Sequence, residues 1–264
     1  MPDRTSTDEA DGPPACLALH GLGGGPFELG PIVKALERAG CRASAPILPG
    51  HSVTGRVMPA SNWADWISTA EAGFDELAAS GRPVVVVGFS TGGTLALLLA
   101  TRRPVARLIL LAPFLAIRHS GLIPVHPSAY LRPIARFLPD IPRRSPPVRD
   151  PEARRVLGSV ARFETFSLRA TLSALDLIEH VKPLVPEIST PTLILQGRLD
   201  SVVDPAGAVW LAGHLGSARK SLLYLSRSDH LLTLDRDRDR AVAAAVAFAL
   251  GRDEEDRDSI VNDP

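Results

Sequence analysis

Cysteine is scarce in this sequence of 264 residues, and neither sign of charge is in excess. The two cysteines, Cys16 and Cys41, are too few for a disulfide framework. Each lies in or beside an apolar, strand-like run, so we expect buried free thiols in a reducing compartment. Lys plus Arg and Asp plus Glu number 29 each, so the formal net charge is zero. No global field therefore indicates a nucleic acid or another polyanion as a partner.

Long apolar runs are also missing. The most hydrophobic stretch, residues 94–100, is short and is followed by Arg102 and Arg103. No run approaches the roughly 18 apolar residues that a membrane-spanning helix needs. Residues 1–14 are acidic and polar, unlike a secretory signal. We therefore expect a soluble, cytoplasmic protein with no transmembrane segment.

What the sequence does have is an alternation of short apolar runs with longer segments of helical spacing. Residues 84–87 are four consecutive valines, which is typical of a strand buried on both faces. The predicted strands are residues 15–20, 42–48, 83–88, 107–111, 192–196 and 221–225. The predicted helices are residues 27–39, 63–79, 91–102, 204–215 and 237–250. This alternation predicts an α/β fold, with a mainly parallel sheet flanked by helices.

One long segment interrupts the alternation. No strand is predicted between about residues 114 and 187, and prolines separate the helix-like pieces. A structureless loop of that length is uncommon in a compact domain, so we expect an inserted, mostly helical cap. The predicted core then has two parts, 14–113 and 189–251, around a cap at 114–188. Residues 1–13 and the acidic tail 252–264 are predicted to be disordered.

A glycine–x–serine–x–glycine pattern follows the valine-rich strand. Gly88, Ser90 and Gly92 stand between that strand and an apolar helix. A tight strand-to-helix turn strains the backbone of the serine and leaves no room for side chains two residues away. It also projects the serine hydroxyl at a helix N-terminus, where developing negative charge is favoured. Ser90 is the predicted nucleophile, and the alternative is a glycine-rich turn that cradles a phosphate.

A second glycine-rich loop, residues 20–25, follows the first predicted strand. A nucleophilic serine needs N–H donors aimed at the oxygen that becomes negative, each worth about 3 kcal/mol of the barrier. The predicted donors of this oxyanion hole are the backbone N–H groups of Thr91, next to the nucleophile, and Leu22, in the second loop. A plain connector is the alternative interpretation of that loop.

These two motifs, His20-Gly21-Leu22-Gly23-Gly24 and Gly88-Phe89-Ser90-Thr91-Gly92-Gly93, resemble the α/β-hydrolase superfamily. In particular the chain looks like bacterial carboxylesterases and monoacylglycerol lipases, from about Ala15 to Leu250. Further shared marks are Leu48-Pro49-Gly50-His51, Trp63 and Trp66. The resemblance implies an α/β-hydrolase fold with an inserted cap. It also implies a serine hydrolase that cleaves carboxylic esters (short or medium acyl esters, or monoacylglycerols) through an acyl-enzyme.

The acid and the base should follow Ser90 in that order along the chain. Of the seven histidines, His230 lies directly after the last predicted strand, where a loop can bring its imidazole over the serine. It is the predicted base. The similar stretch of related esterases ends in the triad aspartate, so the resemblance assigns the acid to Asp200. Asp204 is the runner-up, although its context fits a helix cap, and Asp229 adjoins the base too closely in sequence.

No cofactor or metal is expected. The run Asp235–Arg240 lacks the glycine and the terminal glutamate of a calcium loop, and it fits a capped, salt-bridged helix start. Apolar residues in the insertion favour a hydrophobic acyl or alkyl group on a small ester substrate. Arginines also gather there, and they leave open a weak contact of the cap with anionic lipid or an acidic leaving group; a solvated basic face is the plainer interpretation. They are Arg132, Arg136, Arg143, Arg144, Arg149, Arg154 and Arg155.

Other functions remain open at this point. The same three residues could cleave a thioester or a carbon–carbon bond, because those reactions pass through similar oxyanions. A hydrolase-fold binding protein without catalysis usually lacks one of the three, whereas Ser90, Asp200 and His230 are all present. A haloalkane-type hydrolase is disfavoured because its nucleophile is an aspartate. The scaffold alone does not identify the substrate.

Overall fold

The computed structural model describes residues 12–51, 56–116, 132–135, 137–143, 145–159 and 163–252. Its largest unit is a six-stranded sheet in the order β2-β1-β3-β4-β7-β8, in which every neighbouring pair is parallel. The strands are β1 (Ala15–Leu19), β2 (Ala43–Ser44), β3 (Val84–Phe89), β4 (Arg107–Leu111), β7 (Thr192–Gly197) and β8 (Lys220–Leu225). The predicted α/β fold with a mainly parallel sheet is confirmed.

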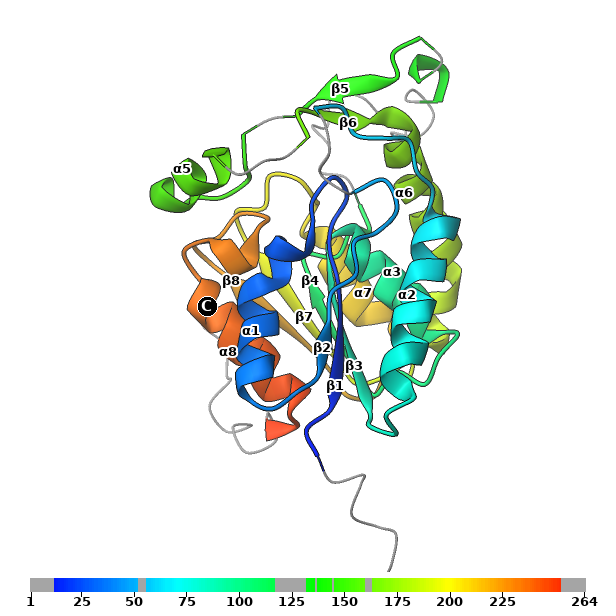
Figure 1. Ribbon diagram of the computed structural model, residues 1–264, viewed down its shortest axis with the longest axis vertical. Coiled ribbons are helices and arrows are strands. Elements are labelled where there is room, and N and C mark those ends of the chain that lie inside the picture. The colour runs from blue at the N-terminus through cyan, green and yellow to red at the C-terminus, as the bar shows by residue number, and fades with distance from the viewer. Residues whose placement is uncertain are drawn as a thin grey trace, which may run out of the picture.

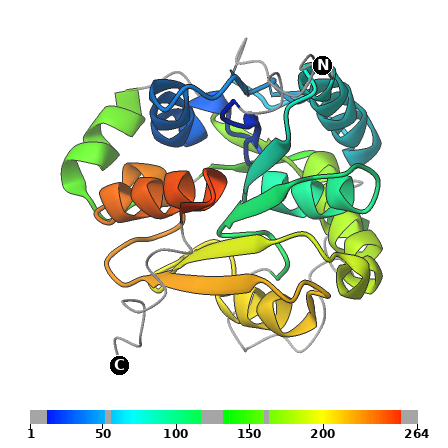
Figure 2. The ribbon, with the colours of Figure 1, turned by 90° about the horizontal axis from the view of Figure 1, so that it is seen from below.

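Helices cover both faces of this sheet (Figure 1). One face carries α1 and α8, which pack against each other, and the other carries α2, α3 and α7, as Figure 2 shows from below. The helices of the core are α1 (Gly30–Arg38), α2 (Trp63–Ala78), α3 (Thr91–Ala100), α7 (Ala206–His214) and α8 (Arg238–Ala249). Short 3₁₀ helices are η1 (Pro26–Leu29), η2 (Lys182–Glu187) and η3 (Leu232–Leu234).

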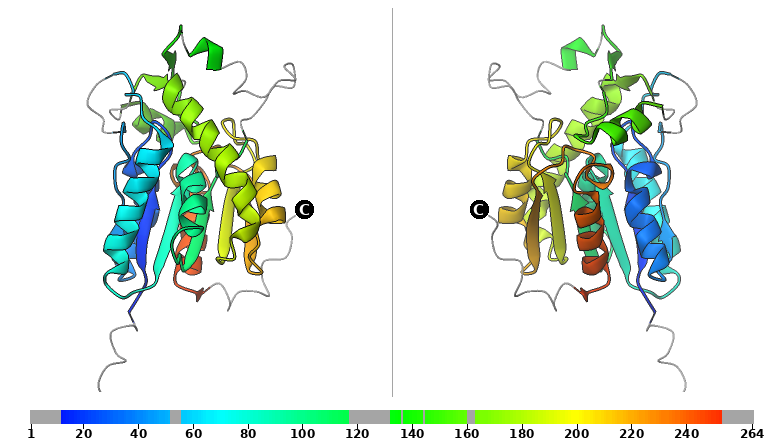
Figure 3. Two further views of the ribbon diagram at one scale, coloured as in Figure 1. Left: turned by 90° about the vertical axis from the view of Figure 1, so that its right-hand side faces the viewer. Right: turned by 90° about the vertical axis from the view of Figure 1, so that its left-hand side faces the viewer.

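The centre of the core is the β3–α3 unit. All six residues of β3 are buried, which agrees with the four-valine pattern. Helix α3 is buried from Thr91 to Leu99, because it is enclosed by the sheet, by α2 and by α6 (Leu168–Val181), which crosses it diagonally (Figure 3). A helix that is apolar all round belongs in such a place. The turn between β3 and α3 is therefore held by packing on both sides.

The second strand is shorter than predicted. Residues 42–48 were expected to pair, but only Ala43 and Ser44 do so, with Cys16 and Leu17 of β1. Pro46 follows and has no N–H to donate to a strand ladder. Beyond it, the Leu48 N–H donates to the Nε2 atom of His20 instead, at 3.1 Å.

The expectation that residues 114–187 contain no strand is wrong. In this segment β5 (Asp140–Pro142) pairs antiparallel with β6 (Thr165–Ser167), above the carboxyl ends of the main sheet (Figure 1). Each strand has three residues, too few for an alternating pattern to be recognised in the sequence. The other elements described here are helical: α5 (Pro151–Ser159), α6 and η2. The predicted cap boundaries stay predictions, and nearly all of segments 1–13 and 252–264 lies outside the described residues.

Both cysteines are free and buried, as predicted. Burial, together with the neighbouring Cys41, raises the pKa of the Cys16 thiol to about 12. Among the helices that the structure describes, none combines the length and apolar character of a membrane span.

Candidate active site

Ser90 lies in the turn between β3 and α3 and has a strained backbone, with φ 52° and ψ −118°. The flanking glycines are required by contact. A Cβ atom at Gly88 would lie 2.4 Å from the carbonyl oxygen of Gly92, and one at Gly92 would lie 2.0 Å from that of Leu19. The turn thus has the strained, side-chain-free form that the sequence pattern predicts.

The structure brings Ser90, His230 and Asp200 into one hydrogen-bonded chain. The Nε2 atom of His230 lies 3.0 Å from the Ser90 hydroxyl oxygen, and its Nδ1 atom lies 2.9 Å from Oδ2 of Asp200. The three residues follow β3, β8 and β7, whose carboxyl ends lie at the same edge of the parallel sheet. The Phe89 ring packs against the imidazole, with 4.9 Å between ring centroids. All three side chains are buried.

The Asp200 carboxylate is fully enclosed and held by N–H donors. Its Oδ1 atom accepts the backbone N–H groups of Val202 and Val203, each at 2.9 Å. Its Oδ2 atom also accepts from Gln196 Nε2 at 3.0 Å. Burial acts to raise the pKa of Asp200, but His230 and the two N–H groups outweigh it and lower that pKa overall. The carboxylate therefore stays ionised beside the imidazole.

The other two aspartates have different partners. Asp204 accepts the N–H of Ala206, the first residue of α7, at 2.9 Å, although the N-cap position is Pro205, one residue later than predicted. Asp229 accepts the backbone N–H and the hydroxyl of Ser201, each at 2.8 Å, and the N–H of His230 at 2.9 Å. Asp229 thus joins the loop of Asp200 to the loop of His230.

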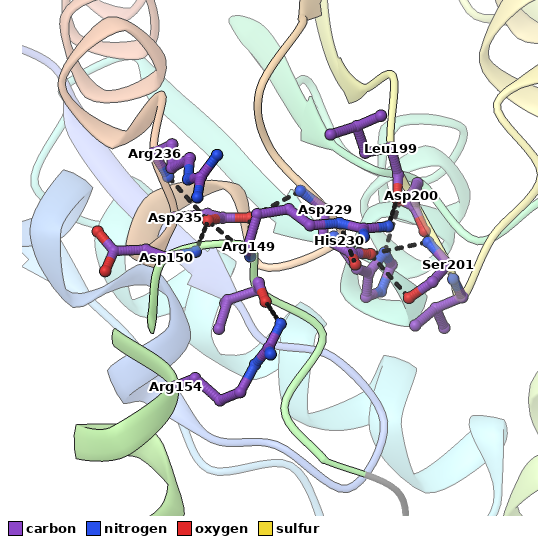
Figure 4. Close-up of polar contacts among 12 residues, drawn as sticks. Arg149, Asp150, Arg154, Leu199, Asp200, Ser201, Asp229, His230, Asp235 and Arg236 are labelled. Carbon is purple, nitrogen blue, oxygen red and sulfur yellow. Dashed lines mark hydrogen bonds and ion pairs between the residues drawn. The ribbon is translucent and has the colours of Figure 1, made fainter. Parts of the chain in front are cut away.

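A further link joins these loops to the inserted segment (Figure 4). Arg149, which precedes α5, places its Nε atom 3.2 Å from Oδ2 of Asp229. The fully buried carboxylate of Asp235 accepts the backbone N–H groups of Arg149 and Asp150 from the insertion, and that of Asp229, at 2.7–2.9 Å. The residue before His230 is therefore linked to the inserted segment twice, by its ion pair with Arg149 and through the carboxylate of Asp235.

The interpretation of Asp235–Arg240 as a capped, salt-bridged helix start is confirmed for the ion pairs, in which Arg238 pairs with Asp150 and Asp237 with Arg227, and is wrong for a side-chain cap. Asp237 occupies the N-cap position of α8, but its side chain makes no capping bond. Its carboxylate instead accepts the Arg227 N–H and the Ser228 hydroxyl. Asp235 and Asp237 thus accept backbone N–H groups of the loop after β8, those of Asp229 and Arg227, in place of capping the helix.

The predicted oxyanion donors belong to two segments that adjoin Ser90, α3 and the glycine-rich turn. Thr91 is the first residue of α3, so its N–H has no acceptor within the helix. Leu22 lies in the turn that the Gly24 N–H closes on the Gly21 carbonyl at 3.2 Å, with Gly23 at φ 66°. That turn abuts the serine, since a Cβ atom at Gly21 would lie 3.3 Å from the Cβ of Ser90.

Sequence reasoning missed several residues around the site. Gln196 contacts Asp200 and Arg149 contacts Asp229, while Glu28 and Arg143 contact the glycine-rich turn. A glutamate in the apolar stretch after that turn was the one available signal, because a buried carboxylate needs partners. The other contacts depend on how the insertion folds back. His20 is buried, and burial with the neighbouring His51 lowers its pKa to about 3, so it is neutral.

Comparison with known proteins gives a consistent result. The sequence profile of the family described as "Serine aminopeptidase, S33" matches residues 13–237. A thermostable monoacylglycerol lipase of a Bacillus species is 26% identical over 232 residues, which are 85% of this chain and 86% of the relative. A pimeloyl-[acyl-carrier protein] methyl ester esterase of Aromatoleum aromaticum is 30% identical over 230 residues, 78% of this chain and 87% of the relative.

The solved structures give the same fold. The crystal structure of a monoacylglycerol lipase from Paleococcus ferrophilus superposes with a TM-score of 0.77 and 22% identity. It covers 91% of this chain, and this chain covers 96% of it. At that identity the likeness concerns the fold.

Proposed function

The chain belongs to the serine aminopeptidase S33 family of hydrolases, and on that premise we propose that it hydrolyses carboxylic esters through Ser90. The observation that carries the proposal is the chain of contacts from the Ser90 hydroxyl through His230 to Asp200, at 3.0 and 2.9 Å. The strained turn at Ser90 supports the same role. Relatives named as a monoacylglycerol lipase and a carboxylesterase favour an ester over other acyl compounds.

In this proposal His230 takes the proton of the Ser90 hydroxyl as the oxygen attacks the ester carbonyl carbon. Asp200 holds the imidazole in the required tautomer and stabilises its charged form. The Leu22 and Thr91 N–H groups receive the oxygen that becomes negative. His230 then protonates the leaving alkoxide, and the acyl group stays on Ser90. Water activated by His230 attacks that acyl-enzyme, which releases the acid and restores the serine.

The substrate class we propose is a small ester with an apolar acyl or alkyl group, including monoacylglycerols. Relatives named as a monoacylglycerol lipase and a methyl ester esterase support this choice. In the insertion, Ile134, Phe137 and Leu138 are exposed, with Phe137 88% exposed. Exposed apolar groups of this kind also support a weak contact with a lipid surface. The described arginines of the insertion contribute less to such a contact, because most of their charge is engaged: Arg132 pairs with Asp176, Arg149 with Asp229 and Arg155 with Glu152.

The test is a comparison of the wild type with Ser90→Ala on nitrophenyl esters, monoacylglycerols, acyl-thioesters and amino-acid nitroanilides. We expect ester turnover in the wild type and a loss of at least about 10³-fold in Ser90→Ala. A fluorophosphonate probe should label the wild type and not the variant. Ester rates equal in the two proteins would refute the proposal. If the wild type hydrolysed thioesters or nitroanilides faster than esters, the substrate would belong to that class and not to the esters.

The proposed lipid contact has its own measurement. Phe137→Ser should reduce cosedimentation with phosphatidylcholine vesicles, because it removes the most exposed apolar side chain of the insertion. Val209→Ser, an exposed apolar position on α7, is the matched control and should leave sedimentation unchanged. Equal sedimentation of all three proteins would contradict the contact.

A further inference from the structure

Glu28 is a buried carboxyl group that the proposed mechanism does not use. It lies in η1, directly after the glycine-rich turn, and is 4% exposed. Its carboxyl fills the space beside Gly24, where a Cβ atom would lie 2.2 Å from the carboxyl atoms. Burial raises the pKa of Glu28 to about 7. Burial of a carboxyl group lowers the stability of the fold unless other groups compensate it. Its place inside the protein therefore indicates a role other than solubility.

The side-chain contact of Glu28 is with the turn that carries Leu22. Its Oε2 atom accepts the backbone N–H of Gly21 at 3.0 Å. On the other side of Leu22, the carbonyl oxygen of Gly23 accepts from Nη1 of Arg143 at 2.5 Å. Arg143 follows β5 and lies over the Phe166 ring of β6, 4.9 Å from its centroid. The peptide that carries the Leu22 N–H therefore lies between two anchored peptides, His20–Gly21 held by Glu28 and Gly23–Gly24 held by Arg143.

The backbone of Glu28 makes a second connection. Its carbonyl oxygen accepts from the hydroxyl of Thr233, in η3, three residues after His230. Glu28 thus contacts both the turn with the proposed oxyanion donor and the loop with the proposed base. A hydrogen-bond donor stabilises the transition state most when it is already in position before the negative charge on the substrate oxygen develops.

We propose that Glu28 is a positioning residue, whose carboxylate orients the Leu22 N–H toward the oxyanion while Arg143 braces the same turn from the insertion. The inference rests on the proposed function, since the oxyanion in question is the one that forms when Ser90 attacks the ester carbonyl. The groups that face Glu28 are Arg143, from the segment after β5, and His230, from the loop after β8, together with the N–H groups of Gly21 and Gly25. All of them favour the ionised form.

The first measurement is the pH profile of kcat for Glu28→Gln, which keeps an acceptor oxygen but loses the charge. We expect kcat to fall about 10- to 100-fold at pH 8.5 with KM changed less than about threefold, because the donor acts on the transition state. Near pH 5.5, where the wild-type carboxyl is mostly protonated, the difference should shrink severalfold. Glu76→Gln, an exposed glutamate of α2 paired with Arg42, is the matched control and should match the wild type.

A second measurement uses stability. The pKa of Glu28 rises from 4.5 to about 7 on folding, so folding takes up a proton between these values. The stability contribution of this group is then complete below pH 4.5 and is lost as pH rises through 7. The melting temperature of Glu28→Gln relative to the wild type should therefore increase from pH 5.5 to pH 8.5. Compared with the wild type, Glu28→Gln should therefore gain stability toward pH 8.5, the same pH at which its kcat is most reduced.

The outcomes separate the inference from the function on which it rests. A wild type no faster than Ser90→Ala would refute ester hydrolysis itself. With an active wild type, unchanged kcat in Glu28→Gln at pH 8.5, or a loss independent of pH, would overturn the role of Glu28. If Glu28→Gln does not fold, Arg143→Met decides the question, because it removes the opposite brace and should also lower kcat with little change in KM. Wild-type kcat in Arg143→Met would then overturn the proposal.

Discussion

The two sides of the site are held in different ways. On the side of the proposed base and acid, Asp200 and Asp229 join the loops after β7 and β8, and Asp235 joins the loop after β8 to the insertion. Each of these three carboxylates accepts several hydrogen bonds. On the oxyanion side, one carboxyl group, Glu28, and one guanidinium, Arg143, hold the glycine-rich turn. The first arrangement has many parallel bonds, and the second has few.

The two sides also differ in electrostatics. The pKa of Asp200 is lowered, because His230 and backbone N–H groups outweigh its burial. The pKa of Glu28 is raised to about 7, because burial outweighs its N–H and cationic neighbours. We infer that the acid side keeps its charge throughout the neutral range, while the oxyanion side changes its charge within it. Variants on each side can test this difference.

The largest effect is expected for Asp200→Asn. An amide in this position cannot hold the charged imidazole and can stabilise the wrong tautomer, so kcat should fall by about 10⁴-fold, with the fold intact. This is at least a hundredfold more than we expect for Glu28→Gln, and it should appear at every pH because Asp200 stays ionised in the wild type. Steady-state kinetics between pH 6 and 9, with circular dichroism as a check of folding, measure it.

Asp204→Asn is the matched control for that change, because it is the next aspartate along the same loop. Its side chain accepts from Ala206 at the start of α7, and asparagine is an equally good cap. The rate should stay within about twofold of the wild type. Equal losses in the two variants would mean that Asp200 is not the acid.

The turn of the predicted nucleophile and the loops of Asp200 and His230 could be located in the sequence because each follows an unbroken local pattern, whereas the choice of Asp200 as the predicted acid came from the resemblance to related esterases. The four valines, Gly88 and Gly92 surround Ser90, and the apolar runs before Asp200 and His230 mark their strands. The alternation of apolar runs likewise predicts the parallel sheet, with strand ends within a few residues except at β2. A periodic pattern over five or six residues is enough for such inferences.

The insertion could not be predicted to the same depth, because its contacts join residues far apart in the chain. Arg143 contacts Gly23, and Arg149 contacts Asp229, across 120 and about 80 residues respectively. Neither arginine differs in local context from its neighbours, so the sequence predicts only a solvated basic face or a weak contact with anionic lipid or an acidic leaving group, and not these internal contacts. The strands β5 and β6 pair for three residues each, and one of them ends in Pro142. Tertiary packing decides these contacts.

A smaller effect, on stability more than on rate, is expected for Asp235→Asn. The wild-type carboxylate accepts four backbone N–H groups, those of Arg149, Asp150, Asp229 and Arg236. The amide keeps one oxygen and turns its NH₂ toward other donors, so the free energy of unfolding should fall by about 2–3 kcal/mol. Urea unfolding measures this quantity. Asp239→Asn, exposed in the first turn of α8, should change it by less than about 1 kcal/mol.

The same variant also tests whether the many bonds on the base side protect catalysis. Asp229 keeps its bonds to Ser201 and His230 in Asp235→Asn, so the imidazole should remain near Ser90 and kcat should fall less than about tenfold. Compared with Asp235→Asn, Glu28→Gln should lower kcat more and lower the free energy of unfolding less. A kcat loss in Asp235→Asn as large as that in Asp200→Asn would contradict this contrast, because it would mean that the base loop depends on one carboxylate alone.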